Sequence, residues 1–226
     1  MFDRIAPRYD ALNRVISAGL DQRWRRRALA KIGVGPGDLV IDLACGTGDF
    51  CELARERGAR VVGVDFALQM LKRGRARGLA FDSVQGDGEW LPFKTASAEV
   101  VTCGFAMRNF VSLESVLREV ARVLKPGGRV AMVDVDRPGW APLRSAHSLY
   151  FDRLVPLIGG LVSDRKAYRY LPQSTAYLPP AAELAAIFVR AGFGAVERES
   201  LLLGSAQILT GVRSEAPGES GEGRAR

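Results

Sequence analysis

The sequence predicts an α/β fold, namely a Rossmann-like, doubly wound, mostly parallel seven-stranded sheet with an antiparallel C-terminal strand and helical lid elements. Three observations predict it. Short apolar runs of strand length alternate with helical patterns through most of the 226 residues, as in a parallel sheet. Residues 99–105 are apolar almost throughout, which is typical of a strand buried on both faces. The last two strand-like runs follow each other without a helix, which favours antiparallel pairing.

The strands are recognised as short runs rich in β-branched and other apolar residues, with glycine or an acidic residue near their ends. Because helical patterns separate the first five runs, we expect these strands to be parallel. The parallel strands are predicted at 39–44, 61–65, 81–85, 99–105 and 129–135. The antiparallel pair is predicted at 195–202 and 206–212.

The helices are recognised by apolar residues that recur at the helical period. The clearest is 113–124, in which apolar residues stand at i, i+1, i+4, i+7 and i+8 from Val116 onward. The run Lys125-Pro-Gly-Gly128 ends this pattern, because proline and glycine do not continue a helix. Further helical patterns lie within 1–30, up to Leu53, and at 67–77, 143–157 and 181–191.

The chain is long enough for one well-packed domain, which we expect to span residues 1–213. Within it, residues 1–30 are predicted to form an N-terminal helical lid. Residues 138–180 interrupt the strand–helix alternation, and we expect them to be an insertion on the substrate side of the sheet. Residues 214–226, rich in Gly, Glu and Arg, have the composition of a disordered tail.

The composition argues against several classes of protein. Three cysteines without a Cys-x-x-Cys pair, together with a single histidine, argue against a disulfide framework and a zinc site, so we expect no metal. No apolar run has the length of a membrane span, and the N-terminus lacks the apolar core of a signal peptide. We therefore expect a cytoplasmic protein.

The net charge of +7 and the isoelectric point near 9.7 leave three interpretations open. The positive charge is concentrated partly in residues 22–27 and 72–77. It favours a nucleic-acid partner, an anionic membrane surface, or simply solvated faces of basic helices. Aromatic residues are sparse among these basic residues and no RNA-binding motif occurs, so we expect no nucleic acid as a partner.

The first predicted strand is followed by the turn Gly46-Thr-Gly48, and the second ends at Asp65, about 20 residues further on. Glycines allow the backbone to approach a ligand closely, and an acid at this spacing accepts both hydroxyls of a ribose. The turn lacks the third glycine of a dinucleotide site and the Lys-Ser/Thr of a phosphate-binding loop. A ribose acid without a pyrophosphate site favours S-adenosylmethionine as the cofactor.

The other predicted strand ends carry unusual residues too, and the carboxyl ends of parallel strands meet at one edge of the sheet. We expect Asp42 and the 46–48 turn to face the methionine portion of the cofactor. Asp87 is placed to accept from the adenine amino group, next to Gly88. Phe66 and Met70 would form apolar walls. Each motif alone is often a plain turn, but their occurrence at consecutive strand ends predicts a site.

At these residues the chain resembles the menaquinone and ubiquinone biosynthesis C-methyltransferases. The opening Met1-Phe-Asp-Arg-Ile-Ala-Pro-Arg-Tyr-Asp10 is similar to theirs, as are Asp42-Leu-Ala-Cys-Gly-Thr-Gly-Asp49 and Gly86-Asp-Gly-Glu-Trp-Leu-Pro-Phe93. Phe105-Ala-Met-Arg-Asn109 and Tyr168-Arg-Tyr-Leu-Pro-Gln-Ser174 are also similar, and the likeness covers roughly residues 1–212. The chain departs from the family where Gly104 stands for a serine and Leu209 for a histidine.

The resemblance implies a class I S-adenosylmethionine-dependent methyltransferase that acts on the ring carbon of a polyprenylated quinol. It places Thr47, Asp65, Asp87 with Gly88, and Gly104 against the cofactor. It also implies peripheral contact with the inner face of the membrane, where a lipid substrate lies. A homodimer is left open. Because the cofactor motifs match better than the acceptor side, a methyltransferase acting on another phenolic or natural-product acceptor is the alternative.

Carbon methylation of a quinol requires an electron-rich ring, which forms when the phenol loses its proton. Arg108 is the candidate for stabilising the phenolate, because its guanidinium stays protonated; the alternative is an ion pair with a neighbouring acid. Asn109 would orient the substrate hydroxyl. Water or a carboxylate, Asp134 or Asp136, would take the proton. The resemblance implies conversion of demethylmenaquinol to menaquinol, and we expect this reaction rather than nucleic-acid methylation or non-catalytic binding.

Overall fold

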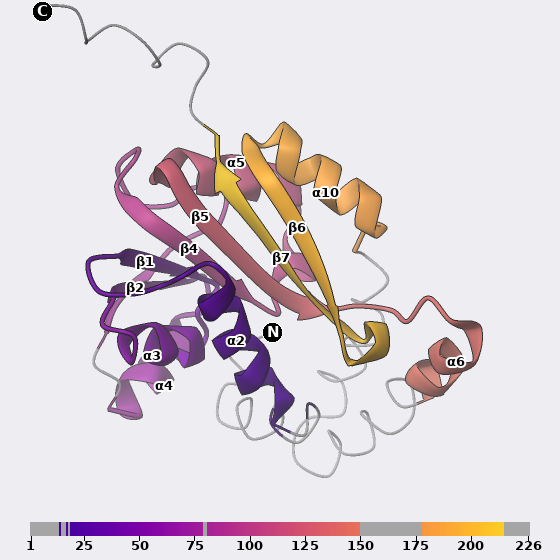
Figure 1. The fold of residues 1–226 in the computed structure, drawn as a ribbon. Helices are drawn as coiled ribbons and strands as arrows, with labels where there is room; N and C mark the ends of the chain where they lie inside the picture. Colours follow the sequence, from indigo (N-terminus) through magenta and orange to yellow (C-terminus); the bar gives the residue numbers. More distant parts are fainter. Residues whose placement is uncertain (1–13, 15–16, 18, 79–80, 150–177, 215–226) are drawn as a thin grey trace, which may run out of the picture.

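The computed structural model describes residues 14, 17, 19–78, 81–149 and 178–214, without the side chains of 146–148 (Figure 1). Several sequence predictions therefore lie wholly or partly outside the described residues. These are most of the N-terminal lid, the end of the 143–157 helix, most of the 138–180 insertion and the tail that follows residue 214. The same holds for the motifs at residues 1–10 and 168–174.

The described strands form one seven-stranded sheet in the order β3-β2-β1-β4-β5-β7-β6. Only β7 runs antiparallel to its neighbours β5 and β6; the other strand pairs are parallel. This confirms the predicted fold class. The strands are β1 (Leu39–Leu43), β2 (Arg60–Asp65), β3 (Asp82–Gln85), β4 (Ala98–Gly104), β5 (Leu124–Val135), β6 (Phe193–Leu201) and β7 (Ala206–Arg213).

Helices cover both faces of the sheet (Figure 1). One apolar core lies between the sheet and α5 and α10, and the other between the sheet and α2 and α3. Among the described helices, none has the length and apolar character needed to cross a membrane. The helices are α2 (Leu20–Lys31), α3 (Asp49–Arg55), α4 (Leu68–Ala76), α5 (Leu113–Val123), α6 (Ala141–Leu149) and α10 (Ala181–Arg190), with 3₁₀ turns η1 (Met107–Asn109) and η4 (Leu202–Gly204).

Strand β1 determines where a ligand can bind, because it pairs with β2 on one side and β4 on the other. The chain leaves β1 toward β2 through α3 and later returns to the opposite side of β1 with β4. The connections after β1 and β4 therefore leave in opposite directions. A crevice forms between such connections at the carboxyl ends of the strands, and this crevice is where open α/β sheets bind ligands.

Strand β5 begins at Leu124, earlier than the sequence pattern indicated. Leu124 pairs with Ala98, and regular pairing resumes with Arg129 opposite Val100. The residues between them form an irregular turn in which Gly127 has a φ of +73°. A Cβ at Gly128 would stand 2.7 Å from the Lys125 carbonyl oxygen, so this close approach requires glycine. The same four residues therefore end a helix and shape the strand that follows.

The hairpin between β6 and β7 has an unusual backbone. Leu202, Leu203 and Gly204 have φ values of +45°, +56° and +95°. The amide of Ser205 closes the turn on the Leu201 carbonyl oxygen at 3.1 Å. For a leucine this left-handed conformation costs roughly 1–2 kcal/mol, whereas glycine adopts it freely. The sequence pattern did not predict that Leu202 and Leu203 would adopt a positive φ.

We expect Phe188→Ala to lower the free energy of unfolding by about 3–5 kcal/mol, because it leaves a cavity in a packed core. Phe188 is fully buried in α10, with its ring 5.8 Å from that of Phe193. The matched control is Val189→Ala, the next residue on the same helix, whose side chain is 60% exposed. Urea denaturation measures both variants. Equal destabilisation of the two would contradict the role of α10 as a core helix.

Candidate functional site

A cavity of about 370 Å³ lies at the carboxyl ends of the central strands. It is lined by the loop after β1, the start of the connection after β2, the loop after β3, and the segment between β4 and η1. The sequence-predicted residues that line it are Gly46, Asp65, Phe66, Met70, Asp87, Gly88, Gly104 and Asn109. The residues that pattern reasoning did not single out include Glu89, Phe105, Phe110 and Val111.

The carboxylate of Asp65 ties two loops together at the cavity. Its Oδ2 accepts a hydrogen bond from the Gly46 amide at 2.7 Å, and its Oδ1 accepts one from the Ala67 amide at 2.8 Å. Gly46 has a φ of +58°, a conformation that favours glycine. The two backbone amides therefore fix the orientation of this carboxylate at the cavity, and its binding of the ribose hydroxyls stays a prediction.

The part of the cavity lined by Phe66, Met70 and Asp87 suits a flat ring. Phe66 is 75% exposed although it lines the cavity, while Met70 is buried beneath it. Asp87 accepts a hydrogen bond from the Glu89 amide at 3.0 Å and is otherwise exposed. A Cβ at Gly88 would stand 3.3 Å from the Phe110 ring, so the loop lies close against this wall. An apolar wall next to a carboxylate suits a base that carries an amino group.

Two predicted cofactor residues, Asp42 and Thr47, are not among the residues that line the cavity. Asp42 lies within β1 on the α3 side, where its Oδ1 accepts from the Thr102 hydroxyl at 2.7 Å. Burial raises its pKa to about 7, although the hydrogen bonds from Thr102 and Cys51 act in the opposite direction. The Thr47 hydroxyl accepts from Arg77 at 3.1 Å. Their contact with a methionine portion stays a prediction.

Arg25 does not contribute to an exposed basic face, although it belongs to the basic run at residues 22–27. Its side chain is buried and pairs with Asp21 at 2.7 Å, one helical turn earlier. The guanidinium lies over the ring of Phe105, 4.8 Å from its centroid, and that of Phe50, at 5.6 Å. Because Phe105 lines the cavity, helix α2 supports one of its walls. The Asp21–Arg25 spacing was the available signal for this pair.

Gly104 is explained by the same cluster. A Cβ at this position would stand 3.1 Å from two atoms of the Phe50 ring and 3.5 Å from the Arg25 Nε. A serine here would require the ring to move by a few tenths of an ångström. The glycine at the end of β4 therefore accommodates Phe50 as it packs beneath the cavity.

The two predicted catalytic residues are neighbours in η1 but have different surroundings. Asn109 lines the cavity. Arg108 donates to the Phe105 carbonyl oxygen at 2.8 Å and forms an ion pair with Asp134 at the end of β5. Both members of this pair are buried, with side chains 8% and 0% exposed. The ion pair that the sequence left as an alternative for Arg108 is therefore present.

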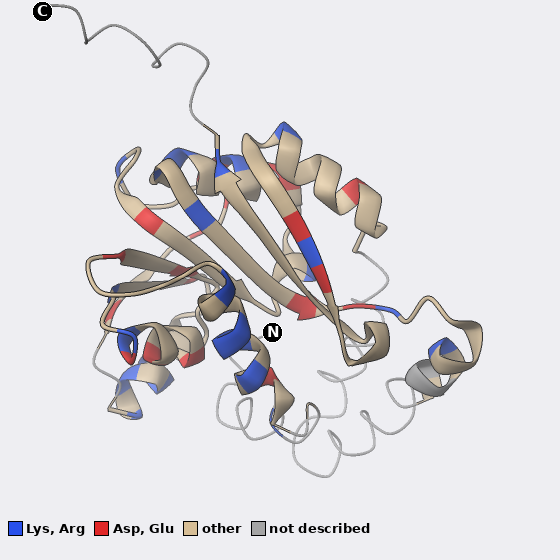
Figure 2. Ribbon diagram, in the orientation of Figure 1, with Lys and Arg blue, Asp and Glu red and all other residues tan. Residues whose placement is uncertain are grey.

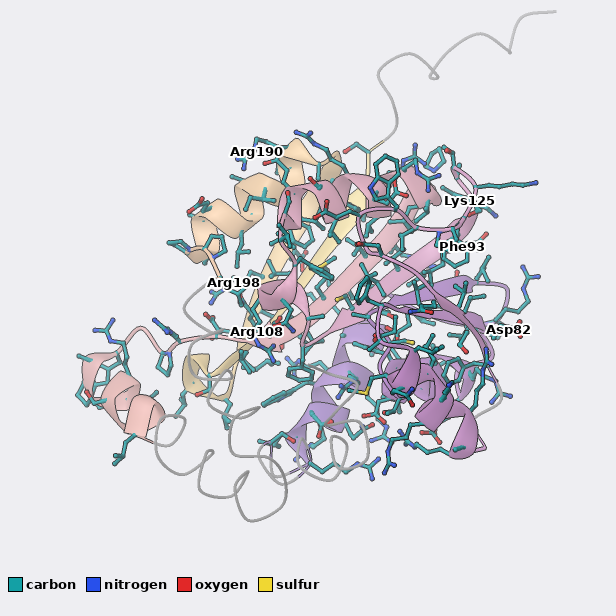
Figure 3. The ribbon with its side chains drawn as sticks, turned by 180° about the vertical axis from the view of Figure 1, so that it is seen from behind. Asp82, Phe93, Arg108, Lys125, Arg190 and Arg198 are labelled. Carbon is teal, nitrogen blue, oxygen red and sulfur yellow. The ribbon has the colours of Figure 1, made fainter. Side chains whose placement is uncertain are left out.

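Asp134 and Asp136, the two candidate bases, are distinguished by their partners. Burial raises the pKa of Asp134, and Arg108 only partly offsets this. Its Oδ1 accepts from Arg108 and from the Val135 amide, while its buried Oδ2 has no partner among the described residues. Asp136 instead forms an ion pair with Arg198, whose Nε donates a hydrogen bond to the side-chain oxygen of Gln207 at 2.7 Å. Gln207 stands opposite Asp134 on β7, and Figure 3 shows Arg108 and Arg198 near this end of the sheet.

Comparison with known proteins gives consistent results. The model of the ubiE/COQ5 methyltransferase family matches residues 1–213. The chain is 42% identical over 220 residues to a demethylmenaquinone methyltransferase of Thermus thermophilus, covering 94% of this chain and 100% of that protein. It is 38% identical over 226 residues to a ubiquinone/menaquinone biosynthesis C-methyltransferase of Geotalea daltonii, covering 94% of both.

A solved structure shares the fold. It is the putative methyltransferase of Haloferax volcanii in complex with the Trm112 methyltransferase activator. The TM-score is 0.69 at 21% identity, and the match covers 95% of this chain and 98% of that chain. Among the described residues, no group of three or more His, Cys, Asp or Glu side chains is placed to hold a metal ion.

We expect Asp65→Ala to weaken the binding of S-adenosylhomocysteine by on the order of 100-fold, because two charge-assisted hydrogen bonds to the ribose are lost. Asp82→Ala is the matched control. Asp82 is exposed at the start of β3, whereas the cavity is lined by the loop that follows the end of this strand (Figure 3). Isothermal titration calorimetry measures both, with melting temperatures to verify folding. Unchanged affinity in a folded Asp65→Ala variant would contradict this assignment.

The pKa of Asp42 predicts a pH-dependent contribution to stability. The folded protein keeps a proton on Asp42 up to about pH 7, whereas the unfolded chain releases it near 3.8. The contribution of this group is thus fully present below pH 3.8 and is lost as the pH rises to about 7.

We therefore expect the stability of the parent, measured relative to Asp42→Asn, to fall over this range by about 1.4 kcal/mol per pH unit at most. Chemical denaturation at a series of pH values measures the difference. A difference that does not depend on pH would show that Asp42 titrates normally.

Proposed function

This chain belongs to the ubiE/COQ5 methyltransferase family and is an S-adenosylmethionine-dependent methyltransferase, and we propose that it methylates the ring carbon of demethylmenaquinol. The observation that carries the proposal is the similarity, over nearly the whole chain, to proteins named for quinone methylation. We further propose that residues 1–213 act as one methyltransferase domain. The product would be menaquinol, and the acceptor would carry a polyprenyl chain.

The cofactor supplies an electrophilic methyl group on a sulfonium, and the residues of the cavity fit its adenosine portion. Asp65 would accept the two ribose hydroxyls, since its oxygens are held toward the cavity by the Gly46 and Ala67 amides. Asp87 would accept from the adenine amino group, and Phe66 with Met70 would contact the ring. Asp42 lies in β1 and Thr47 in the turn that follows it, and we propose that both contact the methionine portion.

The buried pair of Arg108 and Asp134 suits the activation of a phenol. We assign Asp134 as the base, because its Oδ2 has no partner among the described residues and its pKa is raised toward the range of a base. When Asp134 takes the phenol proton it becomes neutral, and Arg108 is left to stabilise the phenolate. In a buried site this charge interaction is stronger than in water. Asp136 is a weaker candidate, because it already holds Arg198.

The acceptor also determines where the protein would work. A polyprenylated quinol resides in a lipid bilayer, and none of the described helices crosses one. We therefore propose that the enzyme acts from the cytoplasmic side through peripheral contact with the membrane. The positive net charge of +7 supports such contact, because the inner leaflet is anionic.

The test of the acceptor is methyl transfer from labelled S-adenosylmethionine to reduced demethylmenaquinone, with a benzoquinol precursor assayed in parallel. We expect product on the naphthoquinol. Cofactor binding without transfer to either quinol would contradict the proposal and favour another phenolic acceptor.

We expect Asp134→Asn and Arg108→Ala each to lower kcat by on the order of 10²–10³ while leaving S-adenosylhomocysteine binding within about twofold. Because a base must be deprotonated to act, kcat of the parent should rise with pH through the raised pKa of Asp134. The Asp134→Asn variant should lack this rise of kcat with pH. Arg118→Ala, which removes an exposed arginine on α5, is the control. Full activity of either buried variant would exclude the assigned role.

A further inference from the structure

We infer that one corner of the molecule is a surface that docks on an anionic lipid bilayer. The corner consists of Leu202 and Leu203 at the β6–β7 hairpin and Trp140 and Leu149 at the two ends of α6, with Arg137 and Arg144 among them. We call it the docking corner. The inference deepens the proposed function, on which it rests, by assigning the surface through which the enzyme would meet a lipid acceptor.

The apolar side chains of the docking corner are exposed to solvent to an unusual extent. Leu202 is 54% exposed and Leu203 is 79% exposed, while Trp140 is 70% and Leu149 is 56% exposed. Single exposed apolar residues are common on protein surfaces, but a group of large ones marks a surface for a partner or a membrane. These side chains protrude from a hairpin tip and a helix, so they suit insertion into lipid.

The hairpin and the segment that leads to α6 are in direct contact. The amide of Asp136 donates to the Ser205 carbonyl oxygen at 2.9 Å, and a Cβ at Gly204 would stand 3.0 Å from the Pro138 Cα. In Figure 1 the tip of the hairpin lies beside the segment between β5 and α6. The hairpin and the segment that leads to α6 are therefore neighbours in space, although they are far apart in the sequence.

The backbone of the hairpin indicates that its leucines serve something outside the fold. Leu202 and Leu203 both have a positive φ, which glycine or asparagine would adopt with less strain. Their exposed side chains add little to the core, so packing does not account for leucine at these positions. Strained residues that persist in a structure point to a function.

Charge and position identify the partner as a bilayer. Arg137 and Arg144 are exposed, while the neighbouring Asp136 forms an ion pair with Arg198. Figure 2 shows basic residues on α6, and both an acidic and a basic residue on the segment before it. Leucine and tryptophan enter the interface of a bilayer, while arginine contacts anionic headgroups. The docking corner lies beyond the carboxyl ends of β5 and β6, the edge at which the cofactor cavity also opens. A lipid acceptor could therefore pass from the membrane to the site over a short path.

The test is co-sedimentation of the full chain with vesicles of equal parts phosphatidylglycerol and phosphatidylcholine. We expect the double variant Leu202→Asn/Leu203→Gly to bind roughly tenfold more weakly than the parent. Its melting temperature should be unchanged or higher, because the new residues suit a positive φ. Val189→Asn, which replaces an exposed apolar residue on α10, is the control and should bind as the parent does.

A second variant tests the charge. Arg144→Gln should weaken binding to the anionic vesicles by about fivefold and leave binding to pure phosphatidylcholine unchanged. Parent-like vesicle binding by the double leucine variant would overturn the inference. A lower melting temperature in that variant would also count against it, because the leucines would then serve the fold.

Failure of the docking corner can be distinguished from failure of the proposed quinol acceptor. Methyl transfer to a quinol with a short, soluble side chain does not require a membrane, so the double leucine variant should retain it at the parent rate. Parent protein that methylates this quinol but does not bind vesicles would overturn the docking corner alone. Leucine-dependent vesicle binding without methylation of any quinol would overturn the acceptor and support the docking corner.

Discussion

The pairing of β1 with both β2 and β4 is the constraint on which the rest of the structure depends. A strand with parallel neighbours on both sides can be reached only by crossover connections, and these place helices over both faces of the sheet. The same arrangement brings the carboxyl ends of the strands to one edge. The glycine turn after β1 and the carboxylate at the end of β2 therefore meet, and the Gly46–Asp65 hydrogen bond joins them.

Around this edge the protein buries several ionisable side chains. Arg25 with Asp21, Arg108 with Asp134, and Asp42 all have little or no exposure. Burying a charge is costly unless it is paired and hydrogen-bonded, so these groups indicate that the edge is organised for more than stability. The unequal satisfaction of the two Asp134 oxygens is the clearest example, because a purely structural ion pair would gain from satisfying both.

Much of the fold and part of the site could be predicted from the sequence. Periodicity located the strands and helices because each element buries a regular face, as the spacing of apolar residues in α5 shows. It could not show that β5 begins at Leu124, because the Lys125–Gly128 turn resembles a simple break. It also could not show that Arg25 is buried, because the partners of Arg25 include two aromatic rings from other elements.

The sequence by itself determined which residues stand at the strand ends, since turn chemistry and strand length are local properties. Gly46, Asp65 and Asp87 follow from that information alone. Only the tertiary structure decided what each side chain contacts. Arg108 meets Asp134, and Gly204 lies beside Pro138, through strand neighbours that are far apart in the chain. The physical reason is that such contacts depend on the order and register of the strands, which are set by packing of the whole domain.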